Sequence, residues 1–462
     1  MESEVFVTPG LGDNSYLVRS GDEAVVVDPQ RDAWRFLATA ERLGVRIRAV
    51  VETHVHNDYV SGAHEIRAAT GASLVLPARG GYDFPHQAAD EGYEFAVGDL
   101  RLVALATPGH TPEHLAWLAF RAGAEEPEGV FTGGSLLVGS AGRTDLLGPA
   151  FTDDLAHAQY ESLSKLAQLS DNVQVLPTHG AGSFCVAAMP GTKATSTIGE
   201  ERRRNMLLRA TDYAGFSTEL SSELMAYPTY YAYMAPINRA GAAVLTRLPE
   251  PTAVPADTID EAMRRGLWVV DARDRKAFAA GHVPGSVNIE LNSGFASYVG
   301  WMLPVDSPVL FVLPDPVDES LGEAMTQLVR IGWTHVEGYL QGGFETWRTY
   351  GGPVASYDLV SADDLCEAHQ RGERPYVVDV RQELEWAWGT VPDSHLIFVA
   401  DLPFKLDDMP RDEPVWLICS NGHRASIAAS LLDRHGIPVR LVGIGGVGEW
   451  RVKCRSLHTA NA

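Results

Sequence analysis

Short apolar runs alternate with turn residues through the first 190 residues, and two segments among them place apolar residues at helical spacing. Runs of roughly four to eight apolar residues bounded by turns predict strands, whereas apolar positions three or four residues apart predict amphipathic helices. The pattern predicts a largely β domain with helices on its outer faces. The expected strands are residues 24–28, 47–52, 72–76, 100–106, 114–120 and 129–138, and the expected helices are residues 34–43 and 153–169.

The character of the chain changes after residue 190. Residues 191–245 combine helical spacing with an aromatic-rich segment, and the Pro-rich stretch Leu248-Pro-Glu-Pro-Thr-Ala-Val-Pro255 follows. Because a stretch this rich in proline continues neither a helix nor a central strand, we place a domain boundary there.

The remaining sequence contains an internal duplication. Val269-Val-Asp-Ala-Arg273 recurs as Val377-Val-Asp-Val-Arg381, and Gly342-Gly-Phe-Glu-Thr-Trp347 recurs as Gly445-Gly-Val-Gly-Glu-Trp450. A repeat of about 100 residues is too long for a solenoid unit and indicates a duplicated domain. Because each copy alternates strands with helical segments, we expect a parallel sheet with crossover helices in each. The predicted domains are residues 1–248, 256–355 (the first copy) and 358–457 (the second copy).

Charge and cysteine content narrow the classes of partner and compartment. The formal net charge of −23 disfavours nucleic acid and anionic membranes, which carry charge of the same sign. No apolar run approaches the length of a membrane span, and the start of the chain has neither the basic residues nor the apolar stretch of an export signal. Four widely spaced cysteines favour free thiols in a reducing cytosol over a disulfide framework. We therefore expect a cytoplasmic protein, and a homo-oligomer is compatible with the sequence.

A cysteine in the second copy stands between an apolar strand, Val415-Trp-Leu-Ile418, and a helical segment, residues 425–432. The positive end of the helix and the backbone N–H groups of the loop Cys419-Ser-Asn-Gly-His-Arg424 favour a thiolate over a thiol. Gly422 lets this loop curl so that several N–H groups converge on one point. We predict that Cys419 is a nucleophile that carries sulfur as a persulfide and that Arg424 binds a sulfur oxyanion. The predicted cradle of the persulfide consists of Ser420, Asn421, Gly422 and His423.

This loop, with Asp379-Val-Arg381 before it and Gly445-Gly and Trp450 after it, resembles the rhodanese family over residues 358–457. The resemblance implies a single-cysteine sulfurtransferase; the competing interpretation of Cys419 is a buried, inert core cysteine. The family's Gly-His-Ile-Pro-Gly-Ala element is altered here to Gly389-Thr-Val-Pro-Asp-Ser394.

The first copy lacks the residues that carry this chemistry. When the two copies are aligned at the prolines before their central strands, Leu313 takes the place of the cysteine and Asp318 takes the place of the loop arginine. Without a thiol the copy has no sulfur carrier. We expect it to be catalytically inert and to pack against its neighbour or help shape a cleft.

Histidines recur where apolar strands of the N-terminal domain end. His54, His56 and Asp58 lie in Val50-Val-Glu-Thr-His-Val-His-Asn-Asp-Tyr59, whereas His110 follows Thr107-Pro-Gly and His179 follows Leu176-Pro-Thr. Imidazoles from separate strand ends can converge on one rim, and imidazole and carboxylate groups are metal ligands. Together these residues predict a metal site.

These motifs resemble the metallo-β-lactamase superfold over residues 5–190, an αββα sandwich with its metal at one edge. The order of this fold, the segment Tyr230–Arg239 and two rhodanese-like domains is similar to the bacterial persulfide dioxygenase–rhodanese fusion family. That resemblance implies one non-haem iron(II), which binds the persulfide of a low-molecular-weight thiol such as glutathione together with O2. The implied products are sulfite and the thiol. The expected fold class is thus α/β multidomain, with an αββα sandwich followed by two rhodanese-like parallel-sheet domains.

Two residues depart from the family pattern. Tyr59 stands where the superfold has a histidine, which removes a ligand from the second metal position, so we expect at most one metal. Gly134 stands where the family has an iron-binding aspartate, although the following Gly142-Arg-Thr-Asp145 fits the family. The resemblance assigns the other two ligands to His54 and His110.

The missing carboxylate leaves three alternatives. His56 joins His54 and His110 in a three-histidine face, or another side chain replaces the carboxylate, or the metal is weakly bound or absent. We expect reduced metal occupancy, which Gly134→Asp should raise. The candidates for a replacement ligand are Asp58, His179 and Asp145.

Three functions remain in competition. The first is an enzyme of sulfane-sulfur metabolism, in which persulfide oxidation at one metal accompanies sulfur transfer at Cys419. Its small-molecule partners would be a thiol persulfide, thiosulfate or sulfite, and O2. The second is a zinc hydrolase of glyoxalase II type, against which the losses at Tyr59 and Gly134 weigh because such hydrolases use two metals. The third is a sulfurtransferase or scaffold protein with a degenerate metal domain.

Overall fold

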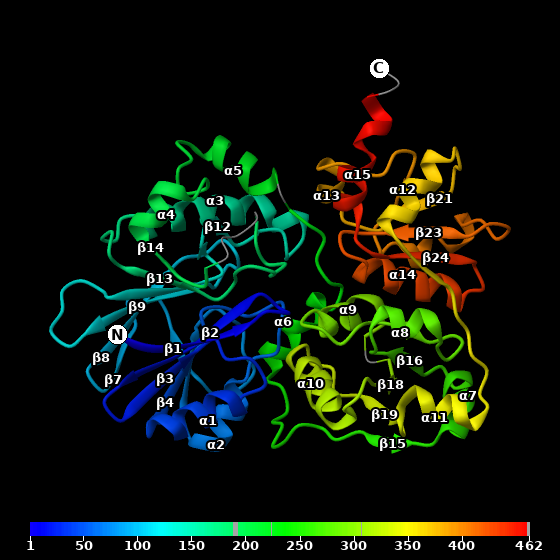
Figure 1. Cartoon of the computed structure of the whole chain (residues 1–462). Helices are drawn as coiled ribbons and strands as arrows, with labels where there is room; N and C mark the ends of the chain where they lie inside the picture. The colour runs from blue at the N-terminus through cyan, green and yellow to red at the C-terminus, as the bar shows by residue number, and fades with distance from the viewer. Residues whose placement is uncertain (188–192, 223, 306, 460–462) are drawn as a thin grey trace. The chain divides into compact units, whose positions relative to one another are not determined.

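The computed structural model of the chain describes residues 1–187, 193–222, 224–305 and 307–459. The chain forms two compact units (Figure 1). The first unit comprises Met1–Leu248 together with Leu328–Gly332, and the second comprises the rest of the chain. No helix within the described ranges is both long and apolar enough to cross a lipid bilayer.

Two six-stranded sheets face each other in the first unit. Tyr16 and Val51 from one sheet and Trp117 and Phe131 from the other share a single buried cluster between the sheets. One sheet contains, in spatial order, β1 (Glu2–Thr8), β2 (Asp13–Ser20), β3 (Glu23–Val27), β4 (Arg46–Val51), β5 (Ser73–Pro77) and β6 (Gln87–Ala89). The other contains β14 (Ser196–Thr197), β13 (Gln174–Pro177), β10 (Gly129–Gly133), β9 (Leu115–Arg121), β8 (Leu100–Ala106) and β7 (Glu94–Val97).

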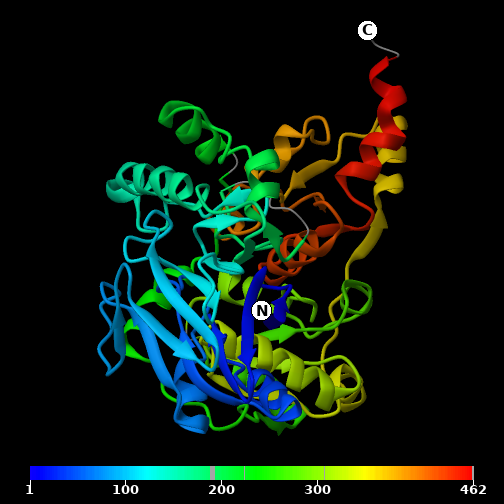
Figure 2. The same cartoon turned by 90° about the vertical axis from the view of Figure 1, so that its left-hand side faces the viewer.

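Helices cover the outer faces of both sheets, on opposite sides of the strands (Figure 2). Phe36 and Ile66 pack against the first sheet, and Leu163 and Phe216 pack against the second. The expected αββα sandwich is therefore confirmed. The helices of this unit include α1 (Trp34–Leu43), α2 (Ala63–Thr70), α3 (Pro149–Leu166), α4 (Ile198–Arg204), α5 (Tyr213–Ser222) and α6 (Tyr231–Ala240).

Strand β3 shows why its apolar run is continuous. Val25 and Val27 point into the layer between the sheets, whereas Ala24 and Val26 pack in the layer beneath the outer helices. Side chains alternate along a strand, so a strand buried on both faces is apolar at successive positions.

The strand expected over residues 129–138 is interrupted. β10 ends at Gly133, whose φ of 53° lies in the left-handed region, and the short strand β11 (Leu136–Leu137) pairs with β12 (Ser140–Ala141) instead. The N–H of Ser135 donates to the carbonyl of Thr132 at 2.9 Å and closes the turn. The paired glycines at 133 and 134 permit this turn, which an apolar run alone does not reveal.

The second unit contains two five-stranded sheets, and every strand pair in them is parallel. The two sheets have the same topology, as a duplicated domain requires. The sheet of the first copy has the order β15 (Thr252–Val254), β19 (Val336–Leu340), β18 (Val309–Val312), β16 (Trp268–Asp271) and β17 (Val287–Asn288). That of the second copy has the order β20 (Asp358–Ser361), β24 (Val439–Ile444), β23 (Val415–Ile418), β21 (Tyr376–Asp379) and β22 (His395–Leu396).

Crossover helices connect these strands in both copies. The first copy contains α7 (Ile259–Arg264), α8 (Arg275–Ala280), α9 (Phe295–Met302), α10 (Val317–Arg330) and α11 (Gly343–Tyr350). The second contains α12 (Ala362–Gln370), α13 (Glu383–Ala387), α14 (His423–Arg434) and α15 (Val447–Thr459). Short 3₁₀ segments occupy Ala256–Thr258, Leu402–Phe404 and Leu406–Asp408.

Strand register fixes the correspondence between the two copies. The last residue of β16 pairs with the last residue of β18, and the last residue of β21 pairs with the last residue of β23. The residue that follows the central strand is therefore Leu313 in the first copy and Cys419 in the second. The two copies have the same strand order, and the first has leucine at the position that Cys419 occupies in the second.

Two of the four cysteines form a disulfide. Cys366 in α12 is bonded to Cys454 in α15, whereas Cys185 and Cys419 are free. The expectation of four free thiols is therefore wrong for this pair. The bonded residues are 88 positions apart, and only the packing of α12 against α15 brings them together.

Candidate metal centre and cysteine loop

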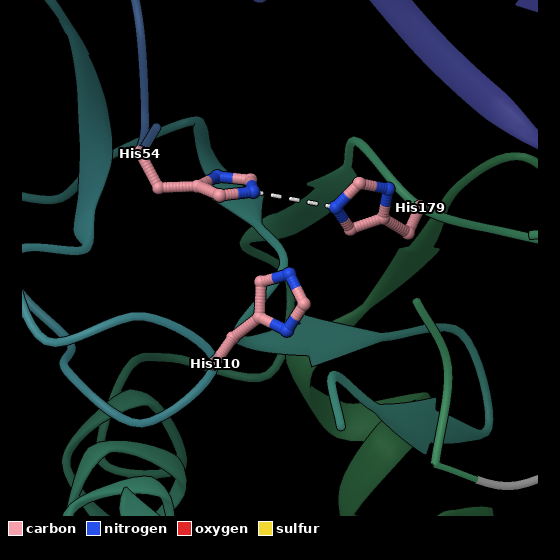
Figure 3. Close-up of side chains that lie close together, drawn as sticks. All are labelled: His54, His110 and His179. Carbon is pink, nitrogen blue, oxygen red and sulfur yellow. Dashed lines mark hydrogen bonds between the residues drawn. The ribbon is translucent and has the colours of Figure 1, made fainter. Parts of the chain in front are cut away.

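Three imidazoles converge in the first unit at the ends of three strands (Figure 3). His54 follows β4, His110 follows β8 and His179 follows β13. One ring nitrogen from each lies within 4.8 Å of the other two, and the Nε2 atoms of His54 and His179 are 3.4 Å apart. All three side chains are buried. Imidazoles in this arrangement are typical of a site for one transition-metal ion.

The outer nitrogen of each imidazole is fixed by a neighbour. Nδ1 of His54 lies 2.8 Å from the hydroxyl of the preceding threonine, and Nδ1 of His110 donates to the carbonyl of Arg143 at 2.8 Å. Nδ1 of His179 donates to Asp13 Oδ1, also at 2.8 Å. Nε2 of His110 is buried and has no hydrogen-bond partner among the described residues. These residues fit a metal ion, because outer hydrogen bonds of this kind leave Nε2 of each ring free to bind it.

The three imidazoles differ in their pKa values, and so in their protonation at neutral pH. Burial, with neighbouring imidazoles, lowers the pKa of His54 and lowers the pKa of His110 to about 3. Burial acts on His179 in the same direction, but Asp58 and Asp13 outweigh it and raise the pKa of His179 to about 9. A metal ion would therefore meet two neutral imidazoles and would displace a proton from the third.

His56 points toward carboxylates. Its Nε2 lies 2.8 Å from Glu52 Oε2 and 3.4 Å from Asp28 Oδ1. Burial disfavours charge on His56, yet the two carboxylates raise its pKa well above the ordinary value. Among the described residues, the third nitrogen beside His54 and His110 thus comes from His179. His56 is placed in two overlapping clusters, one with Asp28 and His54 and the other with Asp58 and His179.

The remaining candidate ligands act on this centre indirectly. Oδ2 of Asp58 lies 3.3 Å from Nδ1 of His179, on the outer side of that ring. Asp145 accepts two hydrogen bonds from Arg143, at 2.6 and 2.7 Å, and the carbonyl of Arg143 in turn accepts from His110. Tyr59 donates to a backbone carbonyl at 3.1 Å and lies 3.0 Å from Nε2 of His56.

Gly134 has no space for a side chain. Its N–H donates to Nε2 of His114 at 3.0 Å, and a Cβ here would lie 2.2 Å from Cδ2 of His110. Real Cβ atoms do not approach a ring carbon this closely, so any side chain would displace His110. The structure thus alters the expectation that Gly134→Asp restores a ligand, because the same substitution would disturb one that is present.

Two buried residues that the sequence did not single out support the histidine loop. Asp28 accepts hydrogen bonds from the backbone N–H and the hydroxyl of Thr53, at 2.7 and 2.8 Å. Asn238 in α6 donates to the carbonyls of His56 and Tyr59, at 2.9 and 2.8 Å. Their sequence signals were indirect, since Asp28 ends an expected strand and Asn238 lies in the segment Tyr230–Arg239 that carried the family resemblance.

Cys419 lies in the second unit at the junction between β23 and α14. The N–H of Gly422 donates to Cys419 Sγ at 3.1 Å, and φ of Gly422 is 91°, which favours glycine. The cysteine is fully buried, as an inert core cysteine would also be. Unlike an inert core cysteine, Cys419 has a backbone N–H donor and a helix N-terminus beside its sulfur, and both favour a negative charge there.

Ser420, Asn421 and His423, the other predicted cradle residues, make hydrogen bonds that stabilise the conformation of the loop. Oδ1 of Asn421 accepts from the N–H of His423 at 3.2 Å, and the hydroxyl of Ser420 donates to Glu385 at 2.8 Å. Among the described residues, the backbone hydrogen bond to the sulfur comes from Gly422.

Arg424 is paired with a carboxylate that the sequence did not single out. Both of its terminal nitrogens bond Glu385, Nη2 at 2.7 Å, and Nη2 also donates to the hydroxyl of Ser420 at 2.9 Å. Burial alone would raise the pKa of Glu385, but the Arg424 hydrogen bonds lower it. The pair neutralises much of the charge that we assigned to the binding of an oxyanion, and it fixes the loop through Ser420.

Comparisons with known families match the two units separately. Residues 8–179 match the Metallo-beta-lactamase superfamily, and residues 255–350 and 361–453 match the Rhodanese-like domain.

Similar curated proteins include hydroxyacylglutathione hydrolases. That of Methylococcus capsulatus is 30% identical over 234 residues, which cover 49% of this chain and 85% of that protein. The cytoplasmic enzyme of Arabidopsis thaliana is 34% identical over 187 residues, which cover 38% of this chain and 67% of that protein. Among solved structures, a metallo-beta-lactamase from Staphylococcus aureus matches with a TM-score of 0.66 at 29% identity, covering 73% of this chain and 98% of that one.

Proposed function

We propose that this chain, which belongs to the metallo-beta-lactamase superfamily through its first unit and carries two rhodanese-like domains in its second, is an enzyme of sulfane-sulfur metabolism. Cys419 transfers sulfur between small thiols or from thiosulfate. The first unit would hold a metal ion whose chemistry is the oxidation of the persulfide of a low-molecular-weight thiol to sulfite.

One observation carries this proposal: the N–H of Gly422 donates to Cys419 Sγ at 3.1 Å in a loop that joins a parallel strand to a helix. A cysteine held in this way is suited to carry a negatively charged outer sulfur. The same position in the first copy is Leu313, so the sulfur carrier belongs to the second copy.

Sulfur transfer at Cys419 needs no external oxidant or reductant. The Cys419 thiolate attacks the outer sulfur of the donor, the S–S bond of the donor breaks, and the electron pair leaves with the thiolate or with sulfite. A new S–S bond then joins Cys419 to the transferred sulfur. An acceptor thiolate attacks that outer sulfur in turn and releases Cys419 as a thiolate.

His54, His110 and His179 would hold one metal ion in the first unit through their Nε2 atoms. A bound iron(II) ion would supply the redox chemistry with O2, in which one persulfide, one O2 and one water give one thiolate, one sulfite and two protons. The chain's own residues orient the three imidazoles through their Nδ1 atoms and bury them.

The test uses the full-length protein loaded with iron(II) and supplied with glutathione persulfide. We expect equal amounts of O2 consumed and sulfite released, and we expect His110→Ala to lose both. Cys419→Ser should keep both but lose sulfur transfer from thiosulfate to a thiol. Cys185→Ser, which removes the other free cysteine, is the matched control for sulfur transfer.

One result would contradict the proposed dioxygenase activity, and another would contradict the proposed sulfur transfer at Cys419. A protein that holds its metal yet consumes no O2 with any thiol persulfide is not a dioxygenase. Undiminished sulfur transfer in Cys419→Ser would show that this cysteine is not the carrier.

The names of the curated relatives favour a second candidate, hydrolysis of a glutathione thioester at the metal centre. A zinc ion there would acidify a water molecule for attack on the thioester. Tyr59 and Gly134 weigh against it, because neither offers the ligand that a second metal needs. Metal analysis and an assay of S-lactoylglutathione hydrolysis together distinguish the two candidates. Bound zinc with rapid hydrolysis supports the hydrolase. Bound iron without hydrolysis supports the dioxygenase. Absence of any metal would leave a sulfurtransferase with a degenerate metal domain.

A further inference from the structure

The peptide bond between Asn421 and Gly422 is held on both sides. On one side the N–H of Gly422 donates to Cys419 Sγ at 3.1 Å, and on the other the carbonyl of Asn421 accepts from Nη1 of Arg275 at 2.7 Å. Arg275 belongs to α8 in the first copy, the copy without a cysteine. The N–H and C=O of a trans peptide point in opposite directions because the unit is planar. A donor that fixes the carbonyl therefore also fixes the direction of the N–H.

We propose that Arg275 of the first copy is a positioning residue for sulfur transfer in the second copy, because it holds the Asn421–Gly422 peptide with its N–H aimed at the sulfur of Cys419. This inference rests on the sulfurtransferase function proposed for Cys419. It goes beyond that function by giving the cysteine-free copy a part in the reaction.

Arg275 is itself held rigidly. Its Nε lies 3.0 Å from Oε1 of Glu290, and its backbone N–H donates to the same oxygen at 2.7 Å. The side chains of Arg275 and Glu290 are only 23% and 13% exposed. A planar guanidinium tied to a carboxylate on one edge presents its other donors in a fixed direction. A hydrogen bond from this cation to the carbonyl also polarises the peptide and strengthens its N–H as a donor.

Gly422 makes the approach of Arg275 possible. A Cβ at residue 422 would lie 2.7 Å from Nη1 of Arg275. The glycine thus permits both the curl of the loop and the contact with the first copy.

The arginine is not part of the shared fold signature. α8 begins at Arg275 and the corresponding helix of the second copy, α13, begins at Glu383, so the equivalent position carries the opposite charge. The arginine is therefore present only in the copy that faces the sulfur-carrying loop.

Other contacts between the copies provide a matched control. Nη1 of Arg434 donates to the carbonyl of Gly285 at 2.5 Å, and Nε2 of His282 lies 3.1 Å from Asp433. Like Arg275, Arg434 joins the copies through one arginine–carbonyl bond, but its partner is not in the cysteine loop. Arg434→Gln should therefore weaken the contact between the copies without changing the Gly422 N–H.

The experiment compares Arg275→Gln, Arg275→Lys and Arg434→Gln in the full chain. The assay measures kcat and KM for sulfur transfer from thiosulfate to cyanide, the half-life of the outer sulfur on Cys419 after loading, and the melting temperature. We expect Arg275→Gln to lower kcat and the half-life by about tenfold while KM for thiosulfate changes little. Arg275→Lys keeps the charge and a donor and should recover part of the loss, and Arg434→Gln should match the wild type in kcat.

Wild-type kcat and half-life in Arg275→Gln would overturn the inference. So would equal losses in Arg275→Gln and Arg434→Gln, because the effect would then come from the packing of the copies in general. If the wild-type protein transfers no sulfur from any donor, the proposed function fails, and the positioning role is tested by the NMR shift of the Gly422 amide. We expect that amide signal to move in Arg275→Gln and not in Arg434→Gln; an unmoved signal overturns the inference.

Discussion

A Cβ on Gly134 would lie 2.2 Å from the ring of His110, and one on Gly422 would lie 2.7 Å from the guanidinium of Arg275. At the residue scale, both sites thus depend on positions where a side chain is absent. The first glycine admits a metal-ligand candidate, and the second admits a donor from another domain. A methyl group on Gly134 would overlap the ring of His110, and a methyl group on Gly422 would overlap the guanidinium of Arg275.

Gly134→Ala should disturb the metal centre, because its Cβ forces the His110 ring away from His54 and His179. We expect metal affinity to fall at least tenfold and the free energy of unfolding to fall by about 1–3 kcal/mol. Metal content after dialysis and urea denaturation measure the two effects. Gly322→Ala in α10, where a Cβ meets nothing within 4 Å, is the control and should retain the metal. Full metal content in Gly134→Ala would show that His110 is not required.

His423 gives a pH dependence to the second unit. Burial, with the charges of Arg275 and Arg424, lowers its pKa to about 4. The unfolded chain, with an ordinary histidine pKa near 6.5, then binds more protons than the folded chain between about pH 4 and 6.5. Stability from this group is complete above that window and is lost as the pH falls through it.

We expect the wild type to lose roughly 2 kcal/mol more than His423→Asn when the pH falls from about 7.5 to 4.5. Urea denaturation at the two pH values measures the difference, and NMR titration of the imidazole measures the pKa directly. An imidazole that titrates near pH 6.5 in the folded protein would contradict this account.

At the scale of elements, α15 connects the sulfur site to the disulfide. The N–H of Val447, in its first turn, donates to the carbonyl of Cys419 at 3.0 Å. Further along the same helix, Cys454 is bonded to Cys366 in α12. The helix whose N–H binds the carbonyl of Cys419 is thus covalently bonded to a second helix of the same domain.

Loss of this disulfide should destabilise the second unit. The bond closes a loop of 88 residues, and constraint of an unfolded loop of this length contributes up to about 4 kcal/mol. We expect a reductant to lower the melting temperature of the wild type but not that of the Cys366→Ser/Cys454→Ser double variant. Peptide mapping without reductant should recover the linked peptides. Two free thiols in that mapping, with a melting temperature unaffected by reductant, would refute the prediction.

For the whole molecule, net charge opposes an anionic sulfur donor. The chain carries a formal charge of −23, and the arginines beside the cysteine loop are paired, Arg424 with Glu385 and Arg275 with Glu290. Each of these arginines is thus balanced by a carboxylate, and we expect the negative net charge of the chain to slow the approach of an anionic donor. Salt should weaken that repulsion.

We expect kcat/KM for thiosulfate to rise about twofold when ionic strength increases from roughly 10 to 150 mM. Alkylation of Cys419 by iodoacetamide, which is uncharged, serves as the control, and its rate should change little. A value of kcat/KM that falls with added salt would indicate a net positive field at the site.

The sequence by itself determined the fold class and the duplication, and it singled out Cys419 as the proposed sulfur carrier. These depend on features that are local along the chain: apolar runs, recurring motifs, and a cysteine between a strand and a helix. It also placed His54, His110 and His179 correctly in the loops after strands, because each lies within a few residues of the end of an apolar run. It left the third metal ligand open among His56, Asp58, Asp145 and His179.

Only the tertiary structure decided which of these groups meet. His179 contacts His54 across 125 positions, and Arg275 contacts Asn421 across 146. The pairing of Arg424 with Glu385 and the disulfide between α12 and α15 likewise join residues that are distant in sequence. Hydrophobic periodicity fixes which face of an element is buried, but it carries no information on which polar side chains then lie within hydrogen-bonding distance across two packed elements. That distance depends on the positions of whole strands and helices, and it decides the ligands, the charge and the donors of each site.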